Sequence, residues 1–366
     1  MRIERAVNNP IISPLQVKPS TDDMVVLSAF NAAATETKEG ILLLIRVAEA
    51  PKQTEREIRV PIAKNDNVII KSFRRDDPLL IAGDPRGIVY ADEIYLTSLS
   101  HFRVARSTDG FNFKIDDKPS IFPTEYYESY GIEDPRITKI GDTYYINYTA
   151  VSHFGVTVAL ITTKDFKHFK KHGVILPPEN KNVAIFPEKI GGKYMMLHRP
   201  STTGLGNQHI WVGSSPDMLH FGDHRPVFSK RPHSWDNVRV GAGAVPIKTS
   251  EGWLEIYHGV NSKLGYCLGA ILLDLNEPWR VLARSKYPFL IPETEYERNG
   301  FYNNVVFTCG ALTFYDNGRH VVNVYYGAAD QHTCRADIFC DDILASLSTD
   351  DISEVMENTA EINIMG

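Results

Sequence analysis

The chain has 366 residues, of which 43% are hydrophobic and 23% charged, so it can bury a large core beneath an ordinary polar surface. Its net charge of -6 argues against a nucleic-acid backbone as the main partner, because phosphate-backbone binding requires a basic surface. The longest apolar run, residues 41–45, is much shorter than the roughly 20 residues that span a bilayer, and the first residues lack a signal-peptide pattern. We therefore expect a cytoplasmic protein with no membrane or nucleic-acid partner.

The segment from residue 50 to residue 75 is polar and charged, and we expect it to form a peripheral hairpin or loop. The next feature is an internal repeat. Asp84-Pro85-Arg86 recurs as Asp134-Pro135-Arg136, and each copy is followed by an apolar residue, a short polar turn and an aromatic-rich strand. Looser copies begin near Phe186, Ala244 and Cys309. Each copy predicts a strand, a tight turn and a second strand.

A second repeated element lies between these copies. Residues 107–113, 162–169 and 214–221 each join a Ser or Thr to an Asp and a later Phe. Units of about 50 residues with four short strands are typical of propellers. We predict an all-β chain that forms one domain, a five-bladed β-propeller over residues 1–366, and the alternative is a β-sandwich with chance similarity. The best helix candidate is residues 341–348.

The four cysteines, Cys267, Cys309, Cys334 and Cys340, form no CxxC pair. No His stands beside them at the spacing of zinc ligands, so we interpret them as free thiols in a reducing compartment and predict no metal site. Nucleotide-binding loops, the HExxH motif and the GxSxG motif are also absent from the sequence.

The inner strands of a propeller converge on a central channel, so corresponding positions in the repeat should face one pocket. Polar residues occupy these positions where a purely structural repeat would favour small or apolar ones. At the starts of the inner strands these are Asp84, Asp134 and Glu188, and at their ends Ser98, Thr149, Arg199, His258 and Tyr326 with Asp330. A mixture of carboxylates, Arg, His and Tyr suits a polyhydroxylated substrate.

The string Gly131-Ile132-Glu133-Asp134-Pro135-Arg136 is more specific than the Asp-Pro-Arg triplet alone. Repulsion between the adjacent carboxylates of Glu133 and Asp134 should raise the pKa of one of them, which suits a general acid. Arg136 could pair with Glu133 and leave Asp134 to act.

Three cationic side chains recur in the later repeats: Arg199, Arg239 and His258. Two arginines and a histidine that face one channel indicate an oxyanion such as phosphate.

The chain resembles glycoside hydrolase family 130, which comprises mannoside phosphorylases and β-mannosidases on a five-bladed propeller. The matching strings are Phe30-Asn31-Ala32, residues 44–49, residues 131–136, Phe186-Pro187-Glu188-Lys189, residues 197–200, Gly241-Ala242-Gly243, Tyr257-His258-Gly259 and residues 326–330. The resemblance implies that Asp134 is the catalytic acid and that its proton reaches the glycosidic oxygen through a sugar hydroxyl. It also implies that Asn31, Arg46 and Asp330 hold the mannosyl unit, and that Arg199, Arg239 and His258 bind phosphate with Lys181. With the repeat positions, the candidate substrate-binding residues are Asn31, Arg46, Asp84, Arg136, Glu188, Tyr326 and Asp330.

An inverting hydrolase needs two carboxylates, one as acid and one as base, whereas a phosphorylase needs the acid and cations that hold phosphate. The cations therefore favour inverting phosphorolysis of a β-mannoside, β-1,2-linked mannobiose or oligomannan by resemblance, to α-mannose 1-phosphate, with phosphate as co-substrate and no cofactor. The first alternative is a β-1,2-mannosidase that uses Glu188 or Glu255 as base, and the second is a non-catalytic sugar-binding propeller. A homo-oligomer is expected from the family resemblance.

Overall fold

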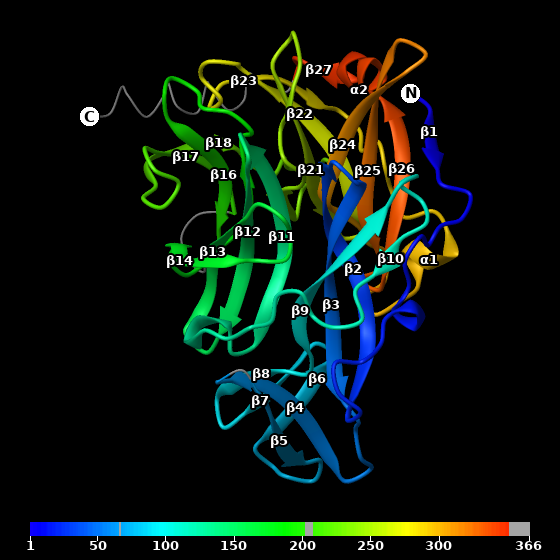
Figure 1. Cartoon of the computed structure of the whole chain (residues 1–366), viewed down its shortest axis with the longest axis vertical. Coiled ribbons are helices and arrows are strands. Elements are labelled where there is room, and N and C mark those ends of the chain that lie inside the picture. The colour runs from blue at the N-terminus through cyan, green and yellow to red at the C-terminus, as the bar shows by residue number, and fades with distance from the viewer. Residues whose placement is uncertain (66, 202–207, 351–366) are drawn as a thin grey trace.

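The computed structural model describes residues 1–65, 67–201 and 208–350, and it consists almost entirely of β-strands (Figure 1). The predicted all-β class is confirmed. The helical elements are η1 (Pro14–Gln16), η2 (Tyr126–Glu128), α1 (Glu295–Arg298) and α2 (Cys340–Ala345). The predicted C-terminal helix therefore exists, and it begins and ends slightly earlier than expected. No helix in the described part of the chain has the length and hydropathy needed to cross a membrane.

Most strands fall into five groups, each with four consecutive antiparallel neighbours. The first group is β2 (Met24–Thr37), β3 (Gly40–Pro51), β9 (Leu99–Ser107) and β10 (Lys114–Ile115). The second is β11 (Gly131–Ile140), β12 (Thr143–Ser152), β13 (Gly155–Thr163) and β14 (Lys170–Leu176). A single parallel pairing between Gly131 and Ser100 joins these two groups into one sheet.

The third group is β15 (Asn180–Ile185), β16 (Tyr194–Pro200), β17 (Ile210–Ser215) and β18 (Gly222–Phe228). The fourth is β19 (Arg239–Ala242), β21 (Trp253–Asn261), β22 (Gly265–Leu273) and β23 (Val281–Ser285), with β20 (Ile247–Lys248) and β27 (Leu347–Ser348) at its edges. The fifth is β24 (Val306–Asp316), β25 (Arg319–Ala328), β26 (His332–Phe339) and β1 (Ile3–Arg5), so the first strand of the chain pairs with strands from its last quarter.

Hydrophobic clusters lie between successive groups of strands. Leu44 and Ile146 belong to a cluster between the first two groups, and Leu160 and Ile185 belong to the next. Further clusters join the third group to the fourth and the fourth to the fifth. Tyr325 of the fifth group packs with residues of β2 and β3 in the first. Side-chain burial therefore links all five groups in sequence, and the last group packs against the first.

The segment between β3 and β9 forms a separate lobe below the main body (Figure 1). It contains the hairpin of β4 (Glu57–Lys64) and β5 (Asn67–Arg74) and the three-stranded sheet of β6 (Leu80–Asp84), β7 (Gly87–Tyr90) and β8 (Glu93–Leu96). The predicted peripheral hairpin is confirmed. However, the first copy of the repeat, Asp84 to Ser98, belongs to this lobe and not to an inner strand. The true equivalent of the later copies is β2–β3, whose alanine-rich sequence lacks the aromatic pattern of the other copies.

The tight turn predicted between the two strands of a copy is confirmed in the copy that begins near Cys309. Asn317 and Gly318 join β24 to β25 with φ values of 47° and 79°, as the hairpin turn requires. The second repeated element is a turn between the third and fourth strands of three groups. In it a Ser or Thr hydroxyl and an Asp carboxylate, such as those of Ser215 and Asp217, accept main-chain N–H groups two and three residues later. All four cysteines are free and buried.

The N-terminal strand is anchored by Arg5, which pairs with the fully buried Glu297 at 2.8 Å. Removing one partner of such a pair leaves an uncompensated charge in the interior. We expect Arg5→Ala to lower the free energy of unfolding by about 3 kcal/mol, measured by urea titration. The matched control is Arg2→Ala, because Arg2 lies just before the same strand and its pair with Glu4 is largely exposed, so its loss should change the free energy of unfolding by less than about 0.5 kcal/mol. Equal losses in the two variants would contradict this assignment.

Candidate active site

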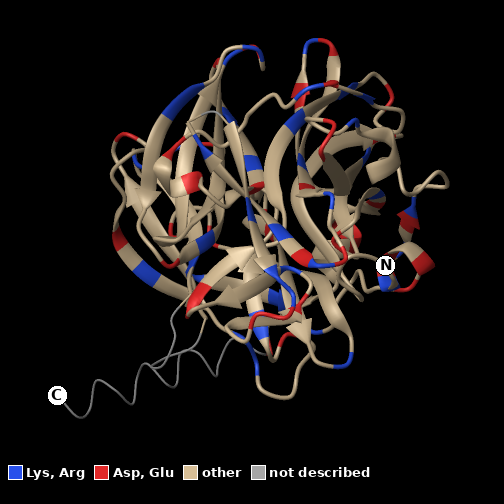
Figure 2. Ribbon diagram, turned by 90° about the horizontal axis from the view of Figure 1, so that it is seen from below, with Lys and Arg blue, Asp and Glu red and all other residues tan. Residues whose placement is uncertain are grey.

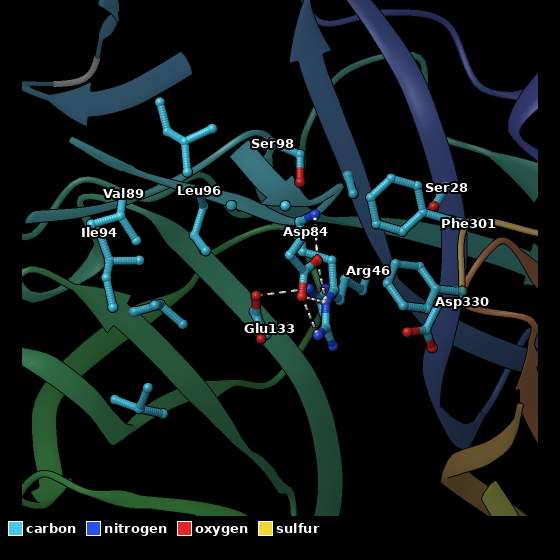
Figure 3. A pocket seen from close by; sticks show the side chains of 18 of the residues that line it. Ser28, Arg46, Asp84, Val89, Ile94, Leu96, Ser98, Glu133, Phe301 and Asp330 are labelled. Atoms are coloured by element: carbon cyan, nitrogen blue, oxygen red, sulfur yellow. Dashed lines mark hydrogen bonds and ion pairs between the residues drawn. The ribbon is translucent and has the colours of Figure 1, made fainter. Parts of the chain in front are cut away.

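Inner strands from all five groups contribute to a cavity of about 110 Å³. It is lined by Asn31, Arg46, Arg86, Asp134, Lys181, Asn182, Arg199, Arg239, His258, Tyr266, Tyr302, Val305, Phe307 and Asp330. An outer cavity of about 620 Å³ shares Arg46, Arg86, Lys181 and Asp330 with it, so the two form inner and outer chambers of one site. Apolar residues of the β6–β8 sheet, including Val89, Ile94 and Leu96, line one side of the outer chamber (Figure 3).

A β-bulge places three polar side chains in the inner chamber. The pairing register shifts at the same point in β2, β11 and β15, where Asn31, Asp134 and Asn182 have φ values of 46°, 49° and 54°. Asn and Asp tolerate this left-handed conformation better than other residues with side chains, and a bulge re-aims the side chain that it carries. Asn182 was missed at the sequence level, although it follows Lys181 as Asp134 follows Glu133 and Asn31 follows Phe30.

Asp134 is held by two neighbours. Its Oδ1 accepts hydrogen bonds from Asn31 Nδ2 and Arg46 Nη1, both at 2.9 Å. Arg46 also donates Nη2 to Glu133 Oε1 at 2.7 Å (Figure 3). Its Nε donates to Ser100 Oγ at 3.0 Å. Gly327 makes room for this arrangement, because a Cβ there would lie 2.0 Å from Asn31 Oδ1. The Gly of the string at residues 326–330 is thereby explained.

The sequence predicted a raised pKa for Glu133 or Asp134, but in the structure the raised pKa belongs to another carboxyl group. Burial raises the pKa of Asp134, but the guanidinium groups of Arg46 and Arg136 outweigh it and lower this pKa below its ordinary value. Arg46, rather than Arg136, pairs with Glu133. The raised pKa belongs instead to Asp330, where burial and the nearby negative charge of Asp134 raise the pKa to about 7. Among these carboxyls, Asp330 is therefore the one that keeps a proton near neutral pH.

Four cationic or potentially cationic side chains line the inner chamber: Lys181, which also lines the outer chamber, and Arg199, Arg239 and His258, which line only the inner one. Arg199 is buried and donates to Val240 O at 3.0 Å, and Arg239 donates to Tyr266 Oη at 2.9 Å. Burial and the Arg239 charge lower the pKa of Arg199 to about 10. Burial and the arginines also lower the pKa of His258, which is therefore neutral in the absence of an anion. In the described residues, no carboxylate lies within ion-pair distance of Lys181, Arg199 or Arg239, and Arg199 Nε and His258 Nδ1 are buried without partners. Such a set of donors suits an oxyanion.

Several residues predicted to face the channel do not line it. Glu188 lies on the exterior and pairs with Lys248, and both side chains are about half exposed. Tyr326 points into the core, where its hydroxyl donates to Glu297 Oε1 at 2.8 Å. Arg136 is buried behind the site and lines neither chamber. Arg136 and Tyr326 lie on strands, whose side chains alternate between two faces, and the alternation directs both away from the chamber. Glu188 lies in the connection between β15 and β16, beyond the strand that lines the chamber.

Asp84 lines only the outer chamber, so it does not mirror Asp134. Its carboxylate pairs with Arg86 at 2.6 Å, and this contact lowers the pKa of Asp84 to about 2. The Arg86 guanidinium in turn lies 4.7 Å from the centre of the Tyr302 ring. Arg86 and Tyr302, which both line the inner chamber, were missed. The lobe that carries Arg86 interrupts the repeat, and Tyr302 lies outside the repeat, in the connection between α1 and β24.

The chain is similar to known proteins over nearly its whole length. Residues 86–349 match a family described as β-1,4-mannooligosaccharide phosphorylase, glycoside hydrolase family 130. A β-1,2-mannobiose phosphorylase from Listeria innocua is 48% identical over 357 residues, which cover 96% of this chain and 99% of that protein. A β-1,2-mannobiose phosphorylase from a Thermoanaerobacter species is 40% identical, with 90% of this chain and 95% of that protein covered. The solved structure of a Listeria innocua β-1,2-mannobiose phosphorylase in complex with β-1,2-mannobiose superimposes with a TM-score of 0.90 at 47% identity, covering 94% of this chain and 99% of that one. The chain belongs to glycoside hydrolase family 130.

Proposed function

We propose that the protein is an inverting β-mannoside phosphorylase that transfers a mannosyl unit to inorganic phosphate. The observation that carries the proposal is the inner chamber itself, where Asp134 shares one cavity with Lys181, Arg199, Arg239 and His258. A carboxyl group can protonate the leaving oxygen, while the cations can hold the phosphate nucleophile and offset its charge. Phosphate is the co-substrate, and the reaction needs no cofactor.

The proposed reaction needs no general base, because phosphate is already a nucleophile. A phosphate oxygen attacks the anomeric carbon from the face opposite the leaving group, the bond from that carbon to the glycosidic oxygen breaks, and α-mannose 1-phosphate forms. The proton that Asp134 supplies, by family resemblance through a sugar hydroxyl, ends on the released acceptor. The phosphate then returns its own proton to the site. A hydrolase would instead need a second carboxylate to activate water.

The two carboxylates suggested as that base do not reach the site. Glu188 pairs with Lys248 on the exterior, and Glu255 is fully buried and lines neither chamber. This geometry disfavours the β-mannosidase alternative.

The charges in the site also suggest how Asp134 acquires its proton. Without substrate, Arg46 and Arg136 keep Asp134 ionised, while Asp330 keeps a proton near neutral pH. A phosphate dianion among the cations would reduce the positive potential of the chamber and raise the pKa of Asp134. We propose that phosphate binding thereby prepares Asp134 to act as the acid.

The substrate is proposed from the outer chamber and from the relatives. Asn31, Arg46 and Asp330 line the inner chamber next to Asp134, where a mannosyl unit can accept and donate hydrogen bonds. The outer chamber of about 620 Å³ is large enough for an acceptor sugar. The similar proteins from Listeria innocua and Thermoanaerobacter are named β-1,2-mannobiose phosphorylases, so we propose β-1,2-mannobiose or a β-1,2-oligomannan as the substrate.

A five-bladed propeller is the arrangement that best accommodates the five groups of strands. It is supported by the hydrophobic clusters between successive groups, by the cluster that joins β25 to β2 and β3, and by the convergence of all five groups on one cavity. In this proposal β1 completes the last blade by pairing with β26. The single domain, the cytoplasmic location and the homo-oligomer expected from the sequence remain predictions.

Phosphate dependence tests the proposed function directly. Incubation of the purified protein with β-1,2-mannobiose should release mannose 1-phosphate only when phosphate is present, as measured by ion chromatography. Asp134→Asn should lower kcat by about 1000-fold, because the amide cannot donate the proton in the same way. Release of free mannose at a comparable rate without phosphate would overturn the proposal.

The cation set predicts a selective loss of phosphate affinity. Arg199→Ala should raise the KM for phosphate by about 10- to 100-fold, the worth of one charge-assisted hydrogen bond, and should leave the KM for mannobiose within about threefold. The control is Arg280→Ala, which removes an exposed arginine that pairs with Glu277. A rise in KM for mannobiose with none for phosphate would place the anion elsewhere.

The proton on Asp330 predicts a pH-dependent change in stability. The pKa of Asp330 is raised to about 7, so the folded state favours the protonated carboxyl and loses stability as pH rises through 7. Asp330→Asn removes this loss, so its melting temperature relative to the wild type should increase by a few degrees between about pH 5.5 and pH 8.5. Asp84→Asn should show no such increase, because the pKa of Asp84 is lowered to about 2. A difference for Asp330→Asn that is constant with pH would contradict the assignment.

A further inference from the structure

Arg136 connects β11, which carries Asp134, to the end of β19, which carries Arg239. Its Nη1 donates to Asp134 O at 3.0 Å, while its Nε donates to Gly243 O at 2.9 Å and its Nη2 to Ala242 O at 3.0 Å. The side chain is 1% exposed and has no carboxylate partner among the described residues. All of its bonds therefore go to main-chain carbonyls, one in β11 and two at the end of β19.

Glu255 holds the same segment from another side. Its Oε1 accepts the N–H of Gly243 at 2.9 Å, and burial raises its pKa to about 8. Gly243 packs closely against β21, because a Cβ there would lie 2.2 Å from Ile256 O. Arg136 and Glu255 thus fix both main-chain polar groups of Gly243.

The segment that they fix also positions the cations. Arg199 Nη1 donates to Val240 O at 3.0 Å, and this bond orients one of the cations proposed to bind phosphate. A Cβ on Gly241 would lie 2.2 Å from the His258 ring and 2.5 Å from Asn182 Nδ2. Residues 240–243, which we name the strut, therefore contact the cations along their length and Arg136 at their end.

We propose that Arg136 and Glu255 are positioning residues that hold Asp134 at a fixed distance from the phosphate-binding cations through the strut. This inference rests on the proposed function. Arg136 acts through the main chain of Asp134, whose left-handed conformation directs the carboxyl group into the inner chamber. The planar fork of a guanidinium can reach three carbonyls at once, whereas a lysine ammonium concentrates its donors at one point.

The first test replaces the guanidinium group of Arg136 and retains its positive charge. Arg136→Lys should lower kcat for phosphorolysis of β-1,2-mannobiose by about 100-fold, since a misplacement of about 1 Å can have this effect. The KM values for phosphate and for mannobiose should stay within about threefold, because the binding side chains remain. The matched control is Arg103→Lys, which changes another fully buried arginine that donates to main-chain carbonyls, those of Asp116 and Asp117, outside both chambers. Its kcat should stay within about threefold of the wild type.

A second pair of variants tests the strut independently of whether Arg136→Lys folds. Glu255→Gln keeps an acceptor for the Gly243 N–H and should retain kcat within about threefold, whereas Glu255→Leu removes the acceptor and should lower kcat about 10-fold at unchanged KM values. A wild-type kcat in Arg136→Lys or Glu255→Leu, or a loss in Arg103→Lys equal to that in Arg136→Lys, would overturn the inference. Absence of phosphorolysis in the wild-type protein would instead overturn the proposed function, so the two failures are distinguishable.

Discussion

The ion pairs of Arg46 are the interaction on which the site depends. One guanidinium, 4.6 Å from the centre of the Phe30 ring, joins Glu133 and Asp134 of the second group of strands to Ser100 of the first. It crosses the boundary where the parallel pairing of Gly131 and Ser100 joins the two groups. The same charge lowers the pKa of Asp134 and opposes the rise in the pKa of Asp330. Structure at this boundary and protonation in the site therefore share one cause.

Charge is distributed unevenly between the two chambers of the site. Glu133, Asp330 and Arg46 line the outer cavity, whereas Arg199, Arg239 and His258 line only the inner chamber, where the two arginines have no carboxylate partners in the described chain. Basic and acidic residues elsewhere are interspersed over the molecule (Figure 2). The unpaired cations therefore cannot be attributed to a generally basic protein, whose net charge is in fact -6. Burying such groups costs stability unless an anion offsets the cost, which is why the inner chamber indicates a ligand.

The sequence predicted the residues of the site better than their directions. Asp134, Arg199 and His258 were identified because they stand at corresponding points of a repeat and within specific strings. Asp84 and Glu188 were misplaced because a repeat in the sequence distinguishes neither an inserted lobe nor a connecting loop from a strand that lines the cavity. The equivalence of Arg46 with Arg199 depends on strand pairing, since each stands opposite the residue that precedes a bulge, Phe30 and Lys181. The raised pKa of Asp330 depends on burial, which only the folded structure defines.

The fold also explains why the acid and the cations belong to different strands. A carboxylate in direct contact with Arg199 or Arg239 would neutralise the cation that phosphate requires, so the acid must be near the anion and yet separated from the groups that bind it. Strands that converge on one cavity can meet this requirement if buried main-chain contacts hold them at a fixed spacing. Arg136 makes two such contacts from β11 to the end of β19 and a third to Asp134 O within β11, and Gly241 and Gly243 allow the close approach that they need. The Gly241-Ala242-Gly243 string thus follows from the close approach of two strands, the one that carries Asp134 and the one that carries Arg239.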